Sequence, residues 1–258
     1  MIKSPRELRQ AIRSGRFGGL TTGHAPGYVQ ANLAIVPSEA AGDFVAFCKA
    51  NASACPVLAV SRPGEPNLPE LGFGIDVRCD LPAYRVYRNG IHTETPADVS
   101  ALWQPDHVAV AIGCWFSMEE ALLRAGVRLR HCELGIQGPL FRTNRAAVAV
   151  GRFGGPIVVS MRPFVCEHVE IVKEITARFP RVHGAPLHGG SASALGIADL
   201  TKPDFGEPME ILPNEVPLYW GCGLTALTTL QASGIPLFIT HAPGAMLVTD
   251  IGNVSLMD

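Results

Sequence analysis

The sequence predicts an α/β protein with a mostly parallel sheet, flanking helices and a smaller α+β subdomain. Three features predict it: short apolar runs, helical segments that follow them, and a repeated strand–Gly-Cys–helix unit. Apolar strands that alternate with helices are typical of parallel sheets buried on both faces. The strand runs are 108–112, 157–160, 216–220 and 237–240, and the helical stretches are 118–125, 167–178 and 226–232.

Other elements follow from local signals. Ser4-Pro5-Arg6-Glu7 predicts a helix start, because serine caps, proline suits the first turn, and glutamate follows three residues after the cap. Residues 40–50 have helical spacing, whereas 29–36 fit a helix or a strand. Tyr84–Arg88 alternates, and the Asn89-Gly90 pair that follows predicts a β-hairpin.

Length allows one large domain or two small ones, since domains mostly have about 100–200 residues and the chain has 258. We take the hairpin as the start of an inserted α/β subdomain. This gives a main domain formed by 1–74 and 155–258 and an inserted subdomain formed by 75–154.

Composition excludes several classes of protein. The chain is 47% hydrophobic and 17% charged with a net charge of −2, so it predicts a folded core and neither a nucleic-acid nor a membrane partner. No apolar run approaches the roughly 20 residues of a membrane span, and Met1–Arg16 lacks the apolar core of a secretory signal. Seven cysteines without a paired CxxC motif favour reduced thiols and a cytoplasmic location.

An internal repeat is the strongest chemical signal. Residues 111–127 (AIGCWFSMEEALLRAGV) and 219–235 (YWGCGLTALTTLQASGI) align without a gap, so that Cys222 corresponds to Cys114. Each unit has a strand, Gly-Cys, two residues, a hydroxyl residue and a helix. We expect Ser117 and Thr225 to cap these helices.

Both thiols should then lie at strand ends beside helix N-termini, where backbone N–H groups attract anions and lower a thiol pKa. Two facing units would form two anion cradles that suit a dicarboxylate. A free cysteine alone is more often a small buried hydrophobe, and the repeat is what favours a function for this pair.

Histidines, arginines and an amide supply further candidates. His24 and His241 each precede Ala-Pro-Gly in similar loops. His131 and Glu133 should share one face of a short strand, as an orienting pair, part of a metal site or a surface pair without a role. Arg162 follows a buried strand. The remaining candidates lie in nearby loops and are Arg142, Asn144, His183 and His188.

The sequence lacks a strand–GxGxxG–helix unit, a P-loop, a GxSxG elbow and an HExxH motif. Nicotinamide, nucleotide-phosphate and serine-hydrolase functions therefore lose support. We expect no organic cofactor, whereas a divalent ion such as Mn²⁺ or Mg²⁺ stays open without a defined ligand set. The expected partner is a small carboxylate substrate, and a homodimer is compatible with the sequence.

Segments across nearly the whole chain resemble the D-glutamate cyclase family of hydro-lyases. The matching stretches, in order, are TGHAPGYVQANLAIVP, IGCWFSMEEALLRAG, RHCELG, FRTN, VVSMRP, VHGAPLHGG, LGIADLTKPDFG, VPLYWGCGLT and ITHAPGAMLVTD. The resemblance implies a two-part α/β fold. It also implies a lyase of D-amino acid metabolism that dehydrates D-glutamate to 5-oxo-D-proline.

Three positions depart from the family pattern. Ser191 and Ala192 stand where Asp-Pro is typical, Ala245 stands where a histidine is common, and Thr225–Leu227 replaces Thr-Pro-Gln. A changed substrate or a weakened cyclase activity would follow.

Cyclisation requires a general base for the amine, a general acid for the departing oxygen and a cation or N–H donors for the oxyanion. We assign proton transfer to the two repeat cysteines and to four histidines, with Glu133 orienting one of them. These histidines are His131, His183, His188 and His241. Carboxylate binding falls to Ser117, Thr225, Arg142, Asn144, Arg162 and His24. Two alternatives stay open: a cofactor-independent racemase or epimerase with two cysteines, and a non-catalytic carboxylate-binding module.

Overall fold

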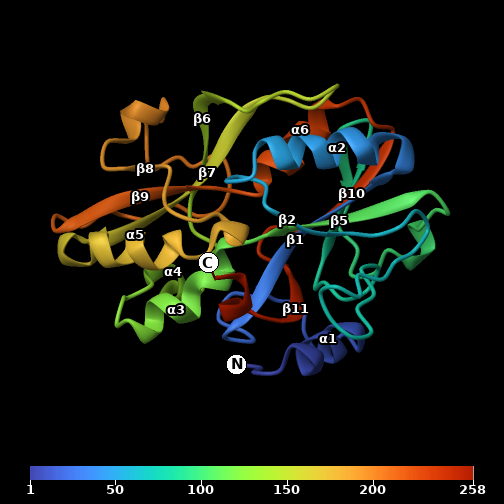
Figure 1. The fold of residues 1–258 in the computed structure, drawn as a ribbon, viewed down its shortest axis with the longest axis horizontal. Coiled ribbons are helices and arrows are strands. Elements are labelled where there is room, and N and C mark those ends of the chain that lie inside the picture. Colours follow the sequence, from blue (N-terminus) through green and yellow to red (C-terminus); the bar gives the residue numbers. More distant parts are fainter. Residues whose placement is uncertain (258) are drawn as a thin grey trace.

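The protein folds into two β-sheets with helices packed around them (Figure 1). A computed structural model describes residues 1–257 and, within them, a seven-stranded and a four-stranded sheet. The first sheet has the order β2-β5-β1-β10-β3-β4, and β11 also pairs with β1. Its strands are β1 (Tyr28–Pro37), β2 (Val57–Val60), β3 (Tyr84–Arg88), β4 (Ile91–Glu94), β5 (His107–Gly113), β10 (Leu237–His241) and β11 (Leu247–Gly252).

The second sheet has the order β6-β7-β9-β8. Its strands are β6 (Leu140–Ala146), β7 (Pro156–Val165), β8 (His188–Gly189) and β9 (Glu215–Gly221). The helices are α1 (Pro5–Arg13), α2 (Ser38–Ala50), α3 (Glu119–Arg124), α4 (Arg130–Leu134), α5 (Val169–Ala177) and α6 (Leu224–Ala232).

The α/β class is confirmed, but the prediction of a mostly parallel sheet is wrong. The central pairs β1–β5 and β7–β9 are antiparallel, as are the other paired strands of both sheets. A strand that is apolar on both faces shows only that both faces are covered. It does not show the direction of its neighbours, so the apolar runs were compatible with either arrangement.

The repeat is larger than the sequence alignment indicated. In β1–β5, Asn32 lies opposite Ile112, and in β7–β9 Ser160 lies opposite Trp220. Equivalent residues of β5 and β9 are separated by the same number of residues as Cys114 and Cys222. Equivalent residues of β1 and β7 are separated by more residues. The two halves therefore share a strand pair of equal register, although β1 and β7 have little sequence in common.

Helices of the two halves pack against each other in two places. α2, which follows β1, packs Phe44 and Phe47 in one apolar cluster with Leu227 and Leu230 of α6 (Figure 1). α5 follows β7 and packs against α3, with Val172 in the cluster that holds Leu122 of α3. In each of these pairs one helix comes from each half, so both pairs lie at the junction of the two halves.

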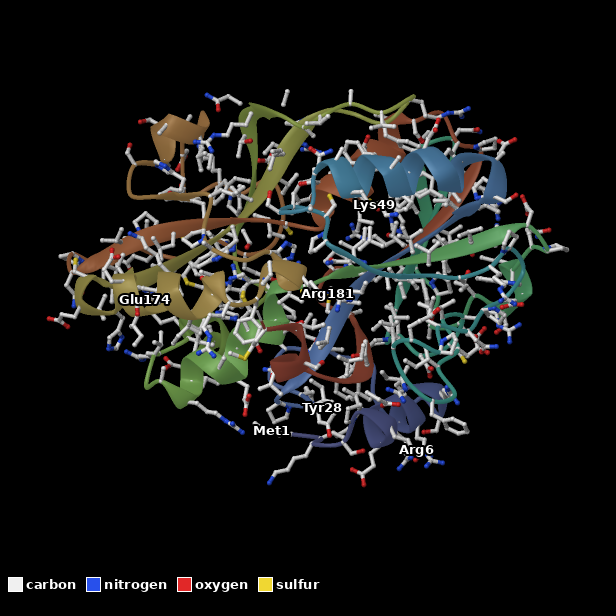
Figure 2. The ribbon with its side chains drawn as sticks, in the orientation of Figure 1. Met1, Arg6, Tyr28, Lys49, Glu174 and Arg181 are labelled. Atoms are coloured by element: carbon white, nitrogen blue, oxygen red, sulfur yellow. The ribbon has the colours of Figure 1, made fainter. Side chains whose placement is uncertain are left out.

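Close backbone contacts fix this junction. A Cβ at Gly113, the last residue of β5, would overlap the carbonyl of Arg181, which lies near the middle of the molecule (Figure 2). A Cβ at Gly221, the last residue of β9, would lie 2.7 Å from the carbonyl of Ser53. The glycine of each Gly-Cys pair thus admits the chain of the opposite half.

Several local predictions are confirmed. Ser4 caps α1 through a hydrogen bond from the Glu7 amide, and Asn89 and Gly90 both adopt positive φ in the β3–β4 turn. Residues 29–36 form a strand within β1, and the apolar runs correspond to β5, β7, β9 and β10. The seven cysteines are free thiols.

The expected subdomain at 75–154 supplies β3, β4 and β5 to the first sheet and β6 to the second. Its boundaries stay a prediction. Within residues 1–257, no helix has the length and apolar character needed to cross a membrane.

Candidate active site

The two Gly-Cys turns are held by the same set of hydrogen bonds. In the first, the Cys114 amide donates to the Gln30 carbonyl at 3.1 Å. The Gln30 amide donates to Ser117 Oγ at 2.9 Å, and that hydroxyl donates back to the Gln30 carbonyl at 3.1 Å. One residue of β1 thereby fixes both the thiol-bearing turn and the hydroxyl three residues later.

The second turn repeats this arrangement on β7. The Cys222 amide donates to the Val158 carbonyl at 2.9 Å, and Thr225 Oγ1 accepts from the Val158 amide at 2.9 Å. The expectation that Ser117 and Thr225 cap the following helices is wrong, because neither α3 nor α6 has a side-chain cap. Both hydroxyls are buried and bind a strand instead, which positions the cysteines.

Cys114 and Cys222 line one cavity of about 30 Å³ at the junction of the two halves. Asn32 and Ser160, the equivalent residues of β1 and β7, line the same cavity, so its wall follows the repeat. Arg162 completes this wall beside the thiols.

Arg162 is buried without an acidic partner. Nη1 donates to the Met161 carbonyl at 2.8 Å, and Nη2 donates to the Gln137 carbonyl at 2.7 Å. Across residues 1–257, no carboxylate lies within 4.0 Å of this guanidinium, and Nε has no hydrogen-bond partner. The guanidinium also lies 5.2 Å from the ring centroid of Trp115. Because no carboxylate in the described structure binds this buried guanidinium directly, and Glu119 compensates its charge only from a distance, the guanidinium is suited to bind an anion.

Other polar atoms of the same wall are also unsatisfied. In the described part of the chain, the buried side-chain atoms at this cavity without a hydrogen-bond partner are Trp115 Nε1, Ser160 Oγ and Arg162 Nε. Unpaired buried donors are rare in folded proteins. Their concentration at one cavity indicates a binding site for a polar molecule.

A second cavity of about 50 Å³ adjoins the first. Asn32, Gln137 and Cys222 line both cavities, so these side chains separate them. The second cavity also has Arg85 of β3 in its wall, and this arginine forms no ion pair within the described residues. The guanidinium groups of Arg162 and Arg85, neither of which forms an ion pair among the residues described, thus lie on opposite sides of this partition of shared side chains.

Burial decides the protonation of both thiols. It raises the pKa of Cys222 to about 11 and the pKa of Cys114 further, because a thiolate loses its hydration there. Backbone N–H groups of the following turns and Arg162 oppose this effect but do not cancel it. The backbone N–H groups act in the expected direction, but desolvation outweighs them, so both side chains are neutral thiols near pH 7.

His183 and His241 are buried at the two cavities. His183 lines the first, and its Nδ1 lies 3.1 Å from the Ser53 carbonyl. His241 lines the second, with Nδ1 3.2 Å from the Leu33 amide nitrogen. Desolvation lowers the pKa of each to about 4, so both imidazoles are neutral near pH 7.

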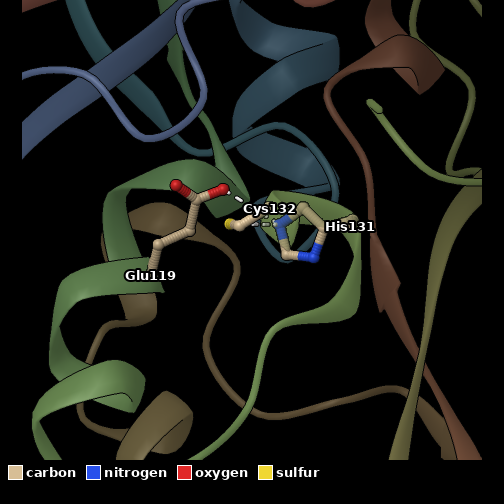
Figure 3. Close-up of side chains that lie close together, drawn as sticks. All are labelled: Glu119, His131 and Cys132. Carbon is tan, nitrogen blue, oxygen red and sulfur yellow. Dashed lines mark hydrogen bonds and ion pairs between the residues drawn. The ribbon is translucent and has the colours of Figure 1, made fainter. Parts of the chain in front are cut away.

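The prediction that His131 pairs with Glu133 is wrong, because these residues belong to the helix α4 rather than to a strand. Glu133 is exposed and binds Arg128 at 2.6 Å. His131 is buried and its Nε2 lies 3.0 Å from Glu119 Oε1 and 3.4 Å from Cys132 Sγ (Figure 3). Burial lowers the pKa of His131, and the nearby Arg162 lowers it further.

The remaining candidates lie outside the walls of both cavities. His24 Nδ1 accepts a hydrogen bond from the Ile2 amide, and His188 Nε2 lies 2.9 Å from the Ser191 carbonyl. Arg142 is exposed and binds Asp204 at 3.2 Å. Asn144 is exposed and lies against Gly196.

Sequence reasoning missed Asn32, Arg85, Gln137 and Glu119. Arg85 was assigned only to a hairpin, and Asn32 only to an apolar segment. Only the strand register shows that Asn32 corresponds to Ser160. Their separation in the sequence differs from that of the two cysteines, so the sequence alignment of the repeat does not match them.

Comparison with known proteins settles the family. The family model described as "D-glutamate cyclase" matches residues 108–250, a span that includes both Gly-Cys turns and Arg162. The chain belongs to the D-glutamate cyclase family. The resemblance recognised in the sequence motifs is thereby confirmed.

Relatives within the D-glutamate cyclase family cover nearly the whole chain. A protein of Azorhizobium caulinodans named "Putative hydro-lyase" is 49% identical over 99% of this chain and 94% of its own length. Relatives with the same description from Jannaschia sp. and Bordetella pertussis are each 50% identical, over 95% and 97% of this chain and 92% and 90% of their own lengths.

Among solved structures, a nitrogen repressor-like protein from Methanococcus jannaschii aligns over 95% of this chain and 98% of its own. The TM-score is 0.38 and the identity 11%, so this likeness has no bearing on the function.

Proposed function

We propose that the protein is a hydro-lyase that cyclises D-glutamate, or a close dicarboxylic amino acid, to 5-oxo-D-proline or its analogue. The observation that carries the proposal is Arg162, a fully buried guanidinium without an acidic partner in residues 1–257, beside two neutral thiols. Family membership and the hydro-lyase names of the relatives support the reaction class.

The two arginines suit the two carboxylates of such a substrate. Arg162 would bind the γ-carboxylate in the first cavity, and Arg85 would bind the α-carboxylate in the second. Asn32 and Gln137 lie between them and offer amide groups to the amine and to the chain of the substrate. Both cavities are small, so substrate must displace the side chains of this partition when it binds.

The proton transfers balance without a redox step. The ammonium group loses a proton to His183, which is neutral near pH 7, and the amine attacks the γ-carboxyl carbon to form the C–N bond. Arg162 stabilises the oxyanion, and the thiols of Cys114 and Cys222 donate to the departing oxygen. The departing oxygen takes one proton from each thiol and leaves as water, and the two protons that the nitrogen gives up, one of them by way of His183, restore the two thiols.

Leu227 lines the second cavity at one of the positions where this chain departs from the family pattern. An aliphatic side chain offers no hydrogen bond at this position, although Thr228 and Gln231 of the same helix line the cavity, and this change would favour a substrate less polar beside Leu227. The panel of substrates in the test must therefore extend beyond D-glutamate.

The test is incubation with D- and L-dicarboxylic and amino acids, followed by mass spectrometry. We expect a product lighter by one water from D-glutamate or a close relative and none from the enantiomer. Failure to form a dehydrated product from any member, with and without divalent metal, would overturn the proposal.

Two cysteines that line one cavity also suit a cofactor-independent amino-acid racemase, in which one cysteine as a thiolate accepts the Cα proton and the other as a thiol donates one to the opposite face. Reaction in deuterium oxide separates the two, because racemisation introduces deuterium at Cα without loss of water. A carboxylate-binding module would instead show thermal stabilisation by ligand and no turnover in either assay.

A further inference from the structure

We propose that Glu119, His131 and Cys132 bind a divalent cation of the zinc type. The three side chains offer a carboxylate oxygen, an imidazole nitrogen and a sulfur, which all lie within 4.8 Å of one another (Figure 3). They come from the first turn of α3 and from α4. The proposal does not depend on the proposed reaction, because it concerns binding alone.

The geometry differs from that of a Cys-His-Glu relay. In a relay, the nucleophile and the carboxylate bind opposite nitrogens of the imidazole. Here Glu119 Oε1 and Cys132 Sγ both approach His131 Nε2, at 3.0 and 3.4 Å. A single ring nitrogen cannot relay a proton between them, whereas a cation can bind all three atoms.

The observed separations are close to those that a tetrahedral ion requires. Zinc bond lengths of about 2.0 Å to nitrogen and oxygen and about 2.3 Å to sulfur place these donors about 3.3 Å (N to O) and about 3.5 Å (N to S) apart. The separations in the protein are 3.0 and 3.4 Å. The two separations that involve His131 therefore need to change by only a few tenths of an ångström, and the carboxylate oxygen and the sulfur lie within 4.8 Å of each other.

Neighbouring groups hold the carboxylate in place. Thr22 Oγ1 donates to Glu119 Oε1 at 2.9 Å, and the Gly23 amide lies 3.3 Å from Oε2. Such outer contacts orient metal ligands. Glu119 is buried and, within residues 1–257, no lysine or arginine lies within 4.0 Å of it.

The fold itself does not require this carboxylate. In the second repeat, the position equivalent to Glu119 is Leu227, an apolar residue in the same turn of α6. A buried acid in only one of two equivalent turns points to a function in that half.

The donor set favours zinc over Mn²⁺ or Mg²⁺, the divalent ions that the sequence left open. A thiolate and an imidazole prefer borderline or soft ions, whereas Mg²⁺ and Mn²⁺ prefer oxygen ligands. Binding converts the Cys132 thiol to a thiolate and releases its proton to solvent. Three protein ligands leave a fourth position for water or for the Thr22 hydroxyl, which lies 3.8 Å from the sulfur.

The test measures metal directly in the full-length protein. After loading with Zn²⁺ and gel filtration, elemental analysis should find one equivalent per chain, and Co²⁺ should produce the thiolate charge-transfer absorption of a cobalt–sulfur bond. Cys132→Ser should abolish this absorption and weaken Zn²⁺ binding at least tenfold. Glu119→Gln should weaken binding and retain the cobalt–sulfur absorption at saturating Co²⁺.

Cys166→Ser is the matched control, because Cys166 is an exposed thiol outside the cluster. It should bind Zn²⁺ and Co²⁺ as the wild type does, and circular dichroism verifies that every variant is folded. Zinc affinity unchanged by both Cys132→Ser and Glu119→Gln, or no metal retained by the wild type, would overturn the proposal. A measured site with no cyclase activity would overturn only the proposed reaction.

Discussion

Cys114 and Cys222 occupy equivalent positions of a repeated turn and line the same cavity, although they lie far apart in the chain. The β1–β5 and β7–β9 pairs bring them together, because each strand pair ends in a Gly-Cys turn at the junction of the two halves. The two thiols can therefore act on one bound molecule, which two unrelated buried cysteines could not do.

The first prediction concerns catalysis by these thiols. Cys114→Ser and Cys222→Ser should each lower kcat by roughly 10²-fold or more, because loss of a positioned proton donor has effects of that size. Steady-state kinetics with the substrate that the enzyme dehydrates measures the change in kcat. Cys166→Ser is the control and should keep full activity. If Cys114→Ser and Cys222→Ser both had the same kcat and KM as the wild type, the thiols would have no part in the mechanism.

The second prediction concerns the anion site. Glutarate, an unreactive dicarboxylate, should stabilise the wild type by about 2.7 kcal/mol at a hundred times its Kd. Arg162→Met and Arg85→Met should each lose most of this stabilisation, whereas exposed Arg152→Met should retain it. Thermal unfolding with and without glutarate measures the difference. Equal stabilisation of all three variants would place the ligand elsewhere.

The third prediction concerns stability in acid. Because the folded pKa of His183 and of His241 is about 4, below the ordinary value of 6.5, the unfolded chain binds more protons between these values. Stability is therefore full above about pH 6.5 and falls as the pH approaches 4. Each histidine should account for a loss of about 2 kcal/mol between pH 7 and pH 5.

Urea unfolding of the wild type and of His183→Asn at both pH values tests this loss. Asparagine suits the position because His183 has a φ of 97°, and asparagine tolerates positive φ. The variant should lose less stability between pH 7 and pH 5 than the wild type. An identical loss in both proteins would contradict the assignment.

The fourth prediction concerns the junction of the two halves. Gly113→Ala should lower the free energy of unfolding by about 1–3 kcal/mol, because its Cβ would overlap the Arg181 carbonyl. Gly42→Ala is the matched control: this glycine lies in α2 with no atom near the added Cβ. That change should be stabilising by about 0.5–1 kcal/mol. Equal effects of the two substitutions in urea unfolding would be inconsistent with the close approach.

Local signals in the sequence predicted the elements that short-range physics determines. The Ser4 cap, the Asn89-Gly90 turn and the apolar strands are of this kind, and the Gly-Cys repeat led to the cavity. Strand direction could not be predicted, because apolar runs do not encode the orientation of their neighbours. The partner of His131 is Glu119 rather than Glu133, because α4 is a helix that directs His131 inward and leaves Glu133 in solvent.

Asn32 and Arg85 could not be predicted as site residues, because strand register alone brings them to the cavities. The thiol pKa values also depend on burial that the sequence does not express. The position of Cys114 and Cys222 beside helix starts indicated lowered thiol pKa values. In the folded protein, desolvation has the larger effect and raises both.

The most direct measurement is a crystal structure of the wild type with glutarate. We expect one carboxylate bound to Arg162 between Cys114 and Cys222, and the other directed towards Arg85. Glutarate bound away from both thiols, with the Arg162 guanidinium free of it, would contradict the proposed site.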